Sequence, residues 1–414
     1  MNSIRNLYAR YKVIFDNILF VSLIQLFGLL APLITYPYLV DVLGMELYGL
    51  VITAQILVGY MVLVIDFGSN SVCAKNVSIH REDKQKLSEI VSSVLLIRLK
   101  LWLICLFAYV LLVFIIPTYN EYKTLFLFSY LLTLNELIFP QFYFQGIEKM
   151  KVVAFLNILV KLVFISLVFF LVKEKGDYLL VPVLYGIGYL IASIISLLLI
   201  FMKDKIRFMI TDYRTQYNYL KECSPIVATD MVCTVKDKLN QVLVGLFVSM
   251  GDVVIYDLAL KLMGIMQKPS NIITTVLLPR FSKNKNVRTL KYVMAFFFFF
   301  CLFLVLIVNL FLPWIVKLFL HSEIDLLPLR MFSIVPIFLS VSIVIGNNFF
   351  IGFGYNKYVL YSIIITSTFY LFALFVVWIL GYIHSLYSFV FIAIISYLIE
   401  LLYRLFVFYR KTIY

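Results

Sequence analysis

The sequence has 414 residues, of which 63% are hydrophobic and 14% are charged, and its formal net charge is +13. A soluble domain carries about 25% charged and 45–50% apolar residues, so this composition excludes an ordinary soluble globule. Apolar stretches of about 18 residues or more recur along the chain, the length at which a helix crosses the hydrocarbon core of a bilayer, and they predict an all-α polytopic membrane protein.

Twelve apolar stretches, separated by short polar breaks, predict twelve transmembrane helices. In chain order we expect them near residues 15–38, 47–68, 88–116, 124–144, 152–172, 178–202, 223–250, 253–279, 292–316, 328–350, 358–380 and 385–409. The first stretch follows a basic segment and lacks a small-residue cleavage site, so we expect it to remain in the mature protein. The longest breaks have about 20 residues and are too short to hold an extramembrane domain.

The Lys and Arg residues lie mostly on one side of the predicted spans. The side that holds both termini has 23 of them and the other side has 5, which leaves 7 of the 35 within spans. Because basic residues concentrate in cytoplasmic loops, we expect both termini in the cytoplasm. This topology signal accounts for the positive charge, and we expect no nucleic-acid partner.

Sequence signals for catalysis and for cofactors are missing. The five cysteines include no CxxC pair, the three histidines lie in predicted loops, and no GxxxxGK[ST] phosphate-binding sequence occurs. We therefore expect no disulfide, no metal, no cofactor and no enzymatic activity, and any energy input would come from an ion gradient or a partner.

The two halves of the chain resemble each other at an offset of 206 to 208 residues. The matched pairs are Gly44 with Gly251, Tyr48 with Tyr256, Phe144 with Phe350, Gly146 with Gly352, Lys149 with Lys357 and Lys123 with Arg330. Many transporters are built from such repeats. We expect two pseudo-symmetric six-helix lobes, residues 1–207 and 208–414.

Charged residues within the predicted spans are the candidate functional residues. The basic ones are Arg98, Lys100, Lys161, Lys236, Lys238, Lys261 and Lys268, and the acidic ones are Asp66, Glu136, Asp230, Asp237 and Asp257. A charge that faces lipid costs about 2.5–3.5 kcal/mol, so these side chains should face the bundle interior or water. Helical spacing places Asp230, Asp237 and Gln241 on one face, and Asp257, Lys261 and Lys268 on another, which predicts a hydrated cavity between the lobes.

Ion pairing is the alternative explanation for these charges. Asp257 and Lys261 are one helical turn apart and could pair, as could Glu400 and Arg404 near the cytoplasmic side. The excess of basic residues favours binding of an anion such as a phosphate-bearing substrate. The role of Lys100 and of Lys238 stays open between substrate binding and structure.

Two groups of residues carry a family resemblance. The segment Pro140–Met150, PQFYFQGIEKM, resembles the FQGxE motif of polysaccharide-transport proteins, although the family often has Trp where this chain has Phe142-Tyr143. Another group resembles the first two spans of the same family: Pro32, Thr35-Tyr-Pro-Tyr38, Gly44, Tyr48, Gly49 and Asp66-Phe-Gly68. The likeness implies a bacterial O-antigen flippase of the multidrug/oligosaccharidyl-lipid/polysaccharide exporter superfamily.

The resemblance implies a substrate and a cellular setting. Such a protein would move undecaprenyl-pyrophosphate-linked O-antigen repeat units from the cytoplasmic to the periplasmic leaflet of the bacterial inner membrane by alternating access, with an O-antigen polymerase and a chain-length regulator as partners. For the substrate site we predict basic residues that attract the pyrophosphate, namely Arg98, Lys161, Lys236 and Lys261, together with Lys268. We predict acidic residues that bind sugar hydroxyls or carry coupling protons, namely Asp66, Asp230, Asp237 and Asp257.

Three other classes of protein compete with this interpretation. A cation-coupled drug exporter of the same superfamily would have an acidic cavity, whereas the charges within these spans lean basic, seven to five. A membrane polymerase or ligase would carry a large periplasmic loop with catalytic residues. A structural scaffold would have little reason to bury so many charges.

Overall fold

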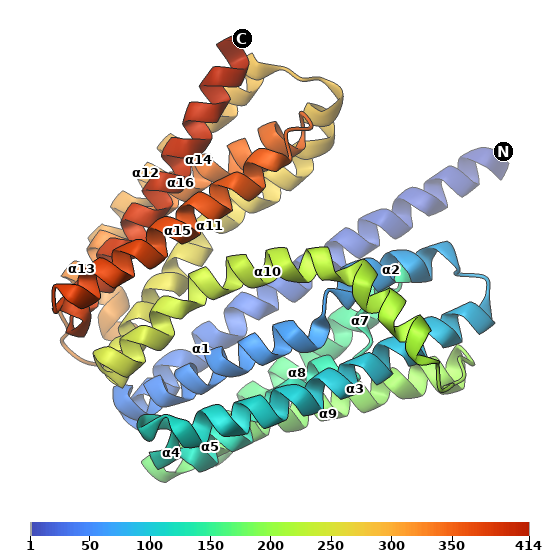
Figure 1. Ribbon diagram of the computed structural model, residues 1–414, viewed down its shortest axis with the longest axis horizontal. Coiled ribbons are helices and arrows are strands. Elements are labelled where there is room, and N and C mark those ends of the chain that lie inside the picture. Colours follow the sequence, from blue (N-terminus) through green and yellow to red (C-terminus); the bar gives the residue numbers. More distant parts are fainter. Residues whose placement is uncertain (1, 414) are drawn as a thin grey trace. The chain divides into compact units, whose positions relative to one another are not determined.

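The computed structural model describes the backbone of residues 2–413, most of which is helical, with short non-helical connections between the helices (Figure 1). Side chains are described for residues 19–412 apart from 21–22, 29, 228–230 and 232–237. The elements are α1 (Asn2–Asp66), α2 (Ser69–Ile79), α3 (Lys84–Ile115), α4 (Pro117–Glu121), α5 (Lys123–Ser129), η1 (Tyr130–Thr133), α6 (Leu134–Ile138), α7 (Gln141–Gly146), α8 (Met150–Leu171), η2 (Lys175–Leu179), α9 (Leu180–Leu198), η3 (Leu199–Lys203), α10 (Tyr213–Phe247), α11 (Met250–Lys283), α12 (Val287–Leu320), α13 (Leu327–Phe332), α14 (Val335–Ile343), η4 (Val344–Ile351), α15 (Lys357–Ile379), η5 (Tyr382–His384) and α16 (Leu386–Ile413).

The helices confirm the predicted class of an all-α polytopic membrane protein. Nine helical segments of the described residues are long and apolar enough to cross a membrane. The first of them, Leu23–Ile79, bends at Gly44, where φ is +78°, and contains residues 23–38 of the first predicted span and all of the second. The seventh and eighth predicted spans correspond to α10 and α11, which have 35 and 34 residues but carry more charge.

The helices form two compact units, Met1–Thr234 and Val235–Tyr414. The division falls inside α10, whereas the repeat in the sequence predicts a boundary between residues 207 and 208. Each unit has its own buried apolar cluster. The cluster of unit 1 includes Val77, Val94, Phe142 and Phe144.

The FQG sequence of the family resemblance forms the contact between α7 and α2. Phe142 and Phe144 are buried, and Gly146 lies directly against α2, where a side chain would meet Val77 and the carbonyl oxygen of Ala74. A glycine at this position lets the two backbones approach closely, as small residues do where membrane helices pack. This contact fixes the position of the loop that carries Pro140.

Unit 2 packs the π-helical segment η4 against α11, α12 and α16. Phe349 and Phe350 of η4 are buried beside Phe281, Phe297 and Phe408. π-Helical turns are uncommon and occur mostly at functional positions in helices. Here the segment holds Gly346 against the guanidinium of Arg404, where a Cβ would lie 2.8 Å from Nη1.

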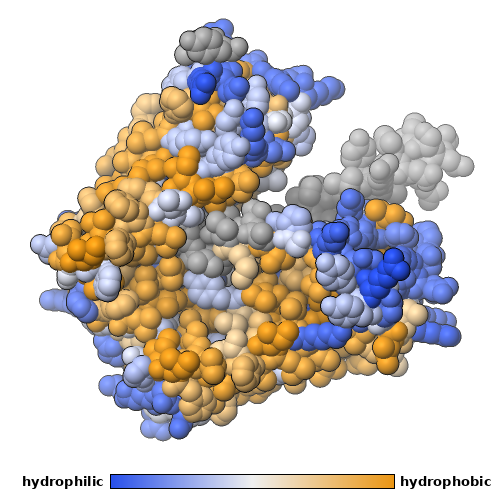
Figure 2. Space-filling view, in the orientation of Figure 1, coloured by the Kyte–Doolittle hydropathy of each residue, from blue (hydrophilic) through white to orange (hydrophobic). Residues whose placement is uncertain are grey.

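Large apolar side chains cover the outside of the helices. Figure 2 shows hydrophobic residues along the helix flanks and hydrophilic residues gathered near the ends. Phe107, Phe170 and Leu310 are each at least 74% exposed. Buried positions between helices often hold small polar residues instead, such as Ser92 and Ser193. This reversal of the soluble pattern is expected when the solvent around the helices is lipid.

We predict that Gly146→Ala destabilises unit 1. The added Cβ would lie 2.5 Å from Cγ1 of Val77 and 2.6 Å from the carbonyl oxygen of Ala74, so α7 and α2 must separate. Overpacking of this kind lowers the free energy of unfolding by about 1–3 kcal/mol, which should appear as a lower melting temperature of the purified protein in detergent. Gly176→Ala is the control, because no atom lies within 4 Å of its Cβ position. Equal melting temperatures for the two variants would contradict the proposed close contact.

Candidate functional site

Arg98 is fully buried in the middle of α3. The helix begins after Asp83, whose carboxylate accepts hydrogen bonds from the backbone N–H groups of Gln85 and Lys86. Arg98 lies 14 residues after the first residue of the helix, or about 21 Å along its axis, close to the midpoint of α3. Its side chain has an exposed fraction of 0%. A guanidinium stays charged in proteins, so its surroundings must supply the compensation that water would otherwise provide.

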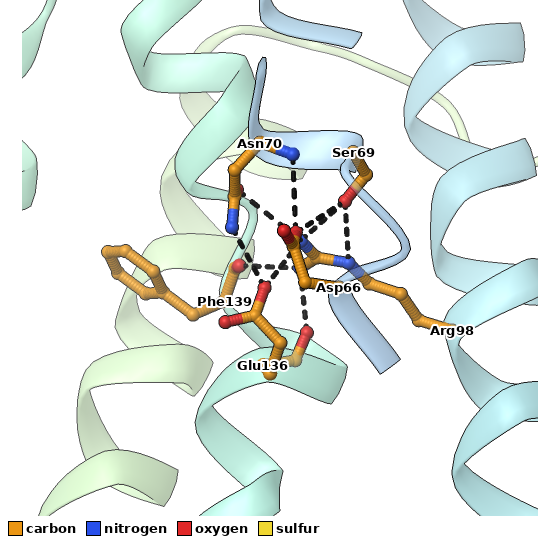
Figure 3. A network of polar contacts seen from close by, with 6 residues as sticks. All are labelled: Asp66, Ser69, Asn70, Arg98, Glu136 and Phe139. Carbon is orange, nitrogen blue, oxygen red and sulfur yellow. Dashed lines mark hydrogen bonds and ion pairs between the residues drawn. The ribbon is translucent and has the colours of Figure 1, made fainter. Parts of the chain in front are cut away.

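Two carboxylates contact the same nitrogen of the guanidinium. Arg98 Nη2 lies 3.0 Å from Oδ1 of Asp66 and 2.6 Å from Oε1 of Glu136 (Figure 3). The hydroxyl of Ser69 accepts hydrogen bonds from Nη2 at 2.7 Å and from Nε at 3.2 Å, and donates to Asp66 at 3.0 Å. Asn70 donates from its side chain to Glu136 at 2.9 Å and from its backbone to Asp66 at 3.2 Å. The five side chains form one connected network.

Two helix breaks supply the remaining contacts. Pro140 has no N–H, so the carbonyl oxygen four residues earlier, in Glu136, lacks its usual helical partner. That oxygen accepts a hydrogen bond from Arg98 Nη1 at 2.6 Å, and the carbonyl oxygen of Phe139 accepts another at 3.1 Å. The second break is at Gly68, which has φ of +75° and starts α2, so that Ser69 and its neighbour reach the guanidinium. Both breaks belong to the sequences that carry the family resemblance.

The network has one cation and two carboxylates. Side-chain exposure is 24% for Asp66 and 14% for Glu136, so the carboxylates lie on the more accessible side of the network while Arg98 lies behind them. Phe142 closes the buried side, with its ring centroid 5.5 Å from the guanidinium carbon. The network presents acidic groups whose positions are fixed by a buried cation.

The sequence alone did not identify this arrangement. Asp66 and Arg98 were both predicted to bind substrate, and the structure brings them together as an ion pair. Glu136 also belongs to the network, although the sequence prediction of the substrate site does not include it. One feature of the sequence points to Glu136, which lies four residues before Pro140. A proline leaves the carbonyl oxygen at that position without its helical hydrogen-bond partner.

Lys161 lies half-buried in α8 of the same unit. Its nearest polar contact is the carbonyl oxygen of Ile24, 3.5 Å from Nζ. Gly28 lies beside the amine, since a Cβ there would be 3.2 Å from Nζ. Among the side chains that the structure describes, no carboxylate lies within ion-pair distance of Lys161.

Unit 2 contains a second polar group. Asp257 forms an ion pair with Lys261, one turn further along α11, and accepts a hydrogen bond from Gln241 at 3.0 Å. The alternative of structural pairing is therefore realised for these two residues. Lys268, two turns beyond Lys261, is half-buried and makes no ion pair with any described side chain.

Three predicted site residues, Asp230, Lys236 and Asp237, lie outside the residues whose side chains are described. Next to them in sequence, Asn240 is buried and belongs to a third network. Its amide donates to the hydroxyl of Tyr256 at 3.0 Å, and its carbonyl accepts from Tyr370 at 2.6 Å. The polar groups of Asn240, which lies close in sequence to the predicted face of Asp230 and Asp237, are thus hydrogen-bonded by neutral side chains.

Unit 1 also has a polar pocket of about 310 Å³ at its predicted cytoplasmic end. Glu89 in its wall pairs with Lys86 at 2.7 Å, and Glu222 accepts a hydrogen bond from Asn76 at 3.1 Å. Tyr219 lies between these pairs and donates to Glu89 at 3.4 Å. The pocket holds none of the residues predicted to bind substrate.

We predict that Arg98→Met destabilises the protein and that removal of the two acids restores stability. Without the guanidinium, the carboxylates of Asp66 and Glu136 remain partly buried and unpaired, which lowers the free energy of unfolding by about 3–5 kcal/mol. The triple variant Arg98→Met, Asp66→Asn, Glu136→Gln removes the uncompensated charge and should melt at a higher temperature than the single variant. Lys151→Met, an equal loss of charge at an exposed position, should leave the melting temperature unchanged. A triple variant less stable than Arg98→Met would contradict the charge explanation.

Comparison with known proteins gives matches in sequence. The model of the family described as polysaccharide biosynthesis protein matches residues 14–285 of this chain. A putative O-antigen transporter of Escherichia coli (strain K12) is 30% identical over 185 residues, which are 44% of this chain and 44% of the relative. A putative O-antigen transporter of Shigella dysenteriae is 29% identical over 187 residues, 44% of this chain and 46% of the relative. These two alignments thus span less than half the length of the curated relatives.

Two solved structures have the same fold and are distant in sequence. The lipid II flippase MurJ, in an inward closed conformation, has a TM-score of 0.67 at 17% identity, covering 94% of this chain and 87% of the other. An outward-facing multidrug resistance MATE transporter of the MOP superfamily has a TM-score of 0.59 at 13% identity, with 95% and 92% coverage. At these identities the likeness establishes the fold. Because the sequence match to residues 14–285 covers well over half of the chain, this protein belongs to the polysaccharide biosynthesis protein family.

Proposed function

We propose that this protein is a flippase that moves undecaprenyl-pyrophosphate-linked O-antigen repeat units from the cytoplasmic to the periplasmic leaflet of the bacterial inner membrane by alternating access. The family, the names of the curated relatives and the fold that it has in common with a lipid II flippase support this proposal. We place both termini in the cytoplasm, on the side with the excess of basic residues. An O-antigen polymerase and a chain-length regulator are the proposed partners.

Two half-buried lysines that pair with no carboxylate among the described side chains carry the proposal. Lys161 in unit 1 and Lys268 in unit 2 are half-buried in helices, and neither pairs with a described carboxylate. By contrast, Asp66 and Glu136 contact Arg98, and Asp257 contacts Lys261. A cation within the hydrocarbon region is costly without a counter-ion, and a pyrophosphate would supply it through charge-assisted hydrogen bonds.

The predicted residues would then divide into two groups. Lys161 and Lys268, with Lys261 and Lys236, would attract the pyrophosphate. Asp66, with Glu136 beside it, would bind sugar hydroxyls or carry a coupling proton, and the same role is proposed for Asp230, Asp237 and Asp257. Direct contact between Arg98 and the substrate stays a prediction, and its complete burial favours a positioning role behind Asp66 in this conformation.

A cation-coupled drug exporter is the second candidate function, because the fold also occurs in multidrug resistance transporters. The basic residues argue against it. The unneutralised groups among the described intramembrane side chains include Lys161 and Lys268, which would repel a cationic drug. We therefore rank the flippase first.

We predict that Lys161→Gln and Lys268→Gln each reduce O-antigen export at least tenfold, and more when combined, because each removes a charge-assisted contact worth about 1.5–3 kcal/mol. The measurement is complementation of a deletion strain, with surface polysaccharide and accumulated lipid-linked repeat units as readouts. Lys175→Gln, an exposed position, is the matched control.

Each outcome of this experiment has a distinct meaning. Loss of surface polymer, together with lipid-linked single units on the cytoplasmic side, supports the flippase. Full export by the double variant, at wild-type protein abundance, contradicts the role of these lysines. Normal surface polysaccharide in the deletion strain would reject the flippase itself and direct attention to drug efflux.

A further inference from the structure

The segment between η3 and α10, residues 204–212, lies as a non-helical strap against α3. The backbone N–H of Arg207 donates to the hydroxyl of Ser88 at 3.1 Å, and that of Met209 donates to Ser92 at 3.0 Å. Since Ser88 and Ser92 are one helical turn apart, they form a row of acceptors along the helix. Irregular backbone near a membrane requires such internal partners, because lipid offers none.

The helix beneath the strap has a face that fits lipid. Leu103, Ile104 and Phe107 are 53%, 64% and 74% exposed. They share one face of α3 with Lys100, which is also exposed, because these residues are three, four and seven positions apart. Exposed apolar side chains in a helix that can cross a membrane indicate contact with acyl chains. Lys100 therefore lies at the end of a lipid-facing stripe.

The amine of Lys100 reaches the start of α10. It donates a hydrogen bond to the side-chain oxygen of Gln216 at 2.8 Å, and it lies 5.9 Å from the ring centroid of Tyr213. Gln216 in turn donates to the carbonyl oxygen of Thr211 at 2.9 Å. A lysine within an apolar stripe extends in this way toward the polar edge of the membrane.

Exposed aromatic and basic groups surround this amine. Tyr213 and Tyr217 are 76% and 53% exposed, and their rings stack with centroids 6.4 Å apart. Arg214, between them in sequence, is exposed, and its guanidinium makes no ion pair with any described side chain. Tyrosines and basic residues at the cytoplasmic membrane surface are the residues that meet lipid headgroups.

The acidic groups of this region are directed elsewhere. Asp204 pairs with Lys149 at 3.0 Å and accepts a hydrogen bond from Tyr143 at 3.1 Å. Hydrogen bonds from Thr215 lower the pKa of Asp212, whose carboxylate is thereby occupied at the start of α10. Neither Asp204 nor Asp212 forms an ion pair with Lys100 or Arg214, so both cations can contact an anionic ligand.

We propose that Lys100, Tyr213, Arg214 and Tyr217 bind the phosphate headgroup of an anionic glycerophospholipid of the cytoplasmic leaflet. One acyl chain of that lipid lies along the stripe of Leu103, Ile104 and Phe107. Lysine and arginine supply charge-assisted hydrogen bonds to the phosphate, and the tyrosine hydroxyls reach the glycerol region. The strap holds the headgroup site at the top of the acyl-chain stripe. This surface belongs to unit 1 alone and does not depend on the substrate that is transported.

The test is lipid binding to the purified full-length protein, measured by native mass spectrometry after titration with phosphatidylglycerol or phosphatidylcholine. The wild type should retain phosphatidylglycerol in preference to phosphatidylcholine. Each basic residue near an anionic surface contributes about a fivefold change in affinity, so Lys100→Gln with Arg214→Gln should weaken phosphatidylglycerol binding about 25-fold. The double variant Lys283→Gln with Arg288→Gln is the matched control, because it removes one exposed lysine and one exposed arginine on the same predicted side.

Three results would overturn the proposal. They are equal retention of the two phospholipids by the wild type, unchanged phosphatidylglycerol binding by the Lys100 and Arg214 variant, and an equal loss in the control variant. Undecaprenyl phosphate is added as a competitor; if it displaces phosphatidylglycerol at a much lower concentration, the surface serves the carrier lipid and the assignment to bulk phospholipid is wrong. Arg214→Gln alone serves where the double variant fails to fold, and its expected effect is fivefold. None of these readouts requires transport, so failure here leaves the flippase proposal standing.

Discussion

The charge of Arg98 is the constraint around which unit 1 is organised. A guanidinium with an exposed fraction of 0% keeps its proton and has no contact with water, so protein groups must surround it. Five residues or backbone groups from three different segments of the chain do so: the end of α1, the start of α2 and the break at Pro140. A mutation in any of these segments therefore alters the surroundings of the same cation.

The two family motifs acquire a physical meaning from this network. Asp66-Phe-Gly68 supplies a carboxylate and a left-handed break, and Pro140 releases the carbonyl of Glu136. Phe142 covers the guanidinium, while Gly146 brings α7 against α2. The motifs are 70 or more residues apart in the sequence, yet they build a single structure. They need not touch the substrate to be required for transport, because they position the acids that face the accessible side.

The sequence predicted those features that depend on local composition. Hydropathy located the twelve spans, because the length of an apolar run is a local property, and helical spacing anticipated the pairs Asp257–Lys261 and Glu400–Arg404, each one turn apart. The pairing of Arg98 with Glu136 joins residues 38 positions apart and depends on how α3 packs beside α6, which no local pattern records. The apolar run 124–144 predicts one span, and Lys123–Gly146 does form one helical segment long enough to cross a membrane. The 3-10 helix η1 and the break at Pro140, which hydropathy does not reveal, divide this segment into shorter helices.

Lys100 and Lys161 show why intramembrane charge alone does not identify a site. Both are lysines within predicted spans, and the sequence left the role of Lys100 open. Lys100 points along an exposed face and reaches Gln216 at the strap, whereas Lys161 lies half-buried against the carbonyl of Ile24. The side chain of Lys100 can extend to the membrane surface, where anionic groups compensate its charge. Lys161 is half-buried and pairs with no described carboxylate, and for that reason it is the stronger candidate for contact with a transported pyrophosphate.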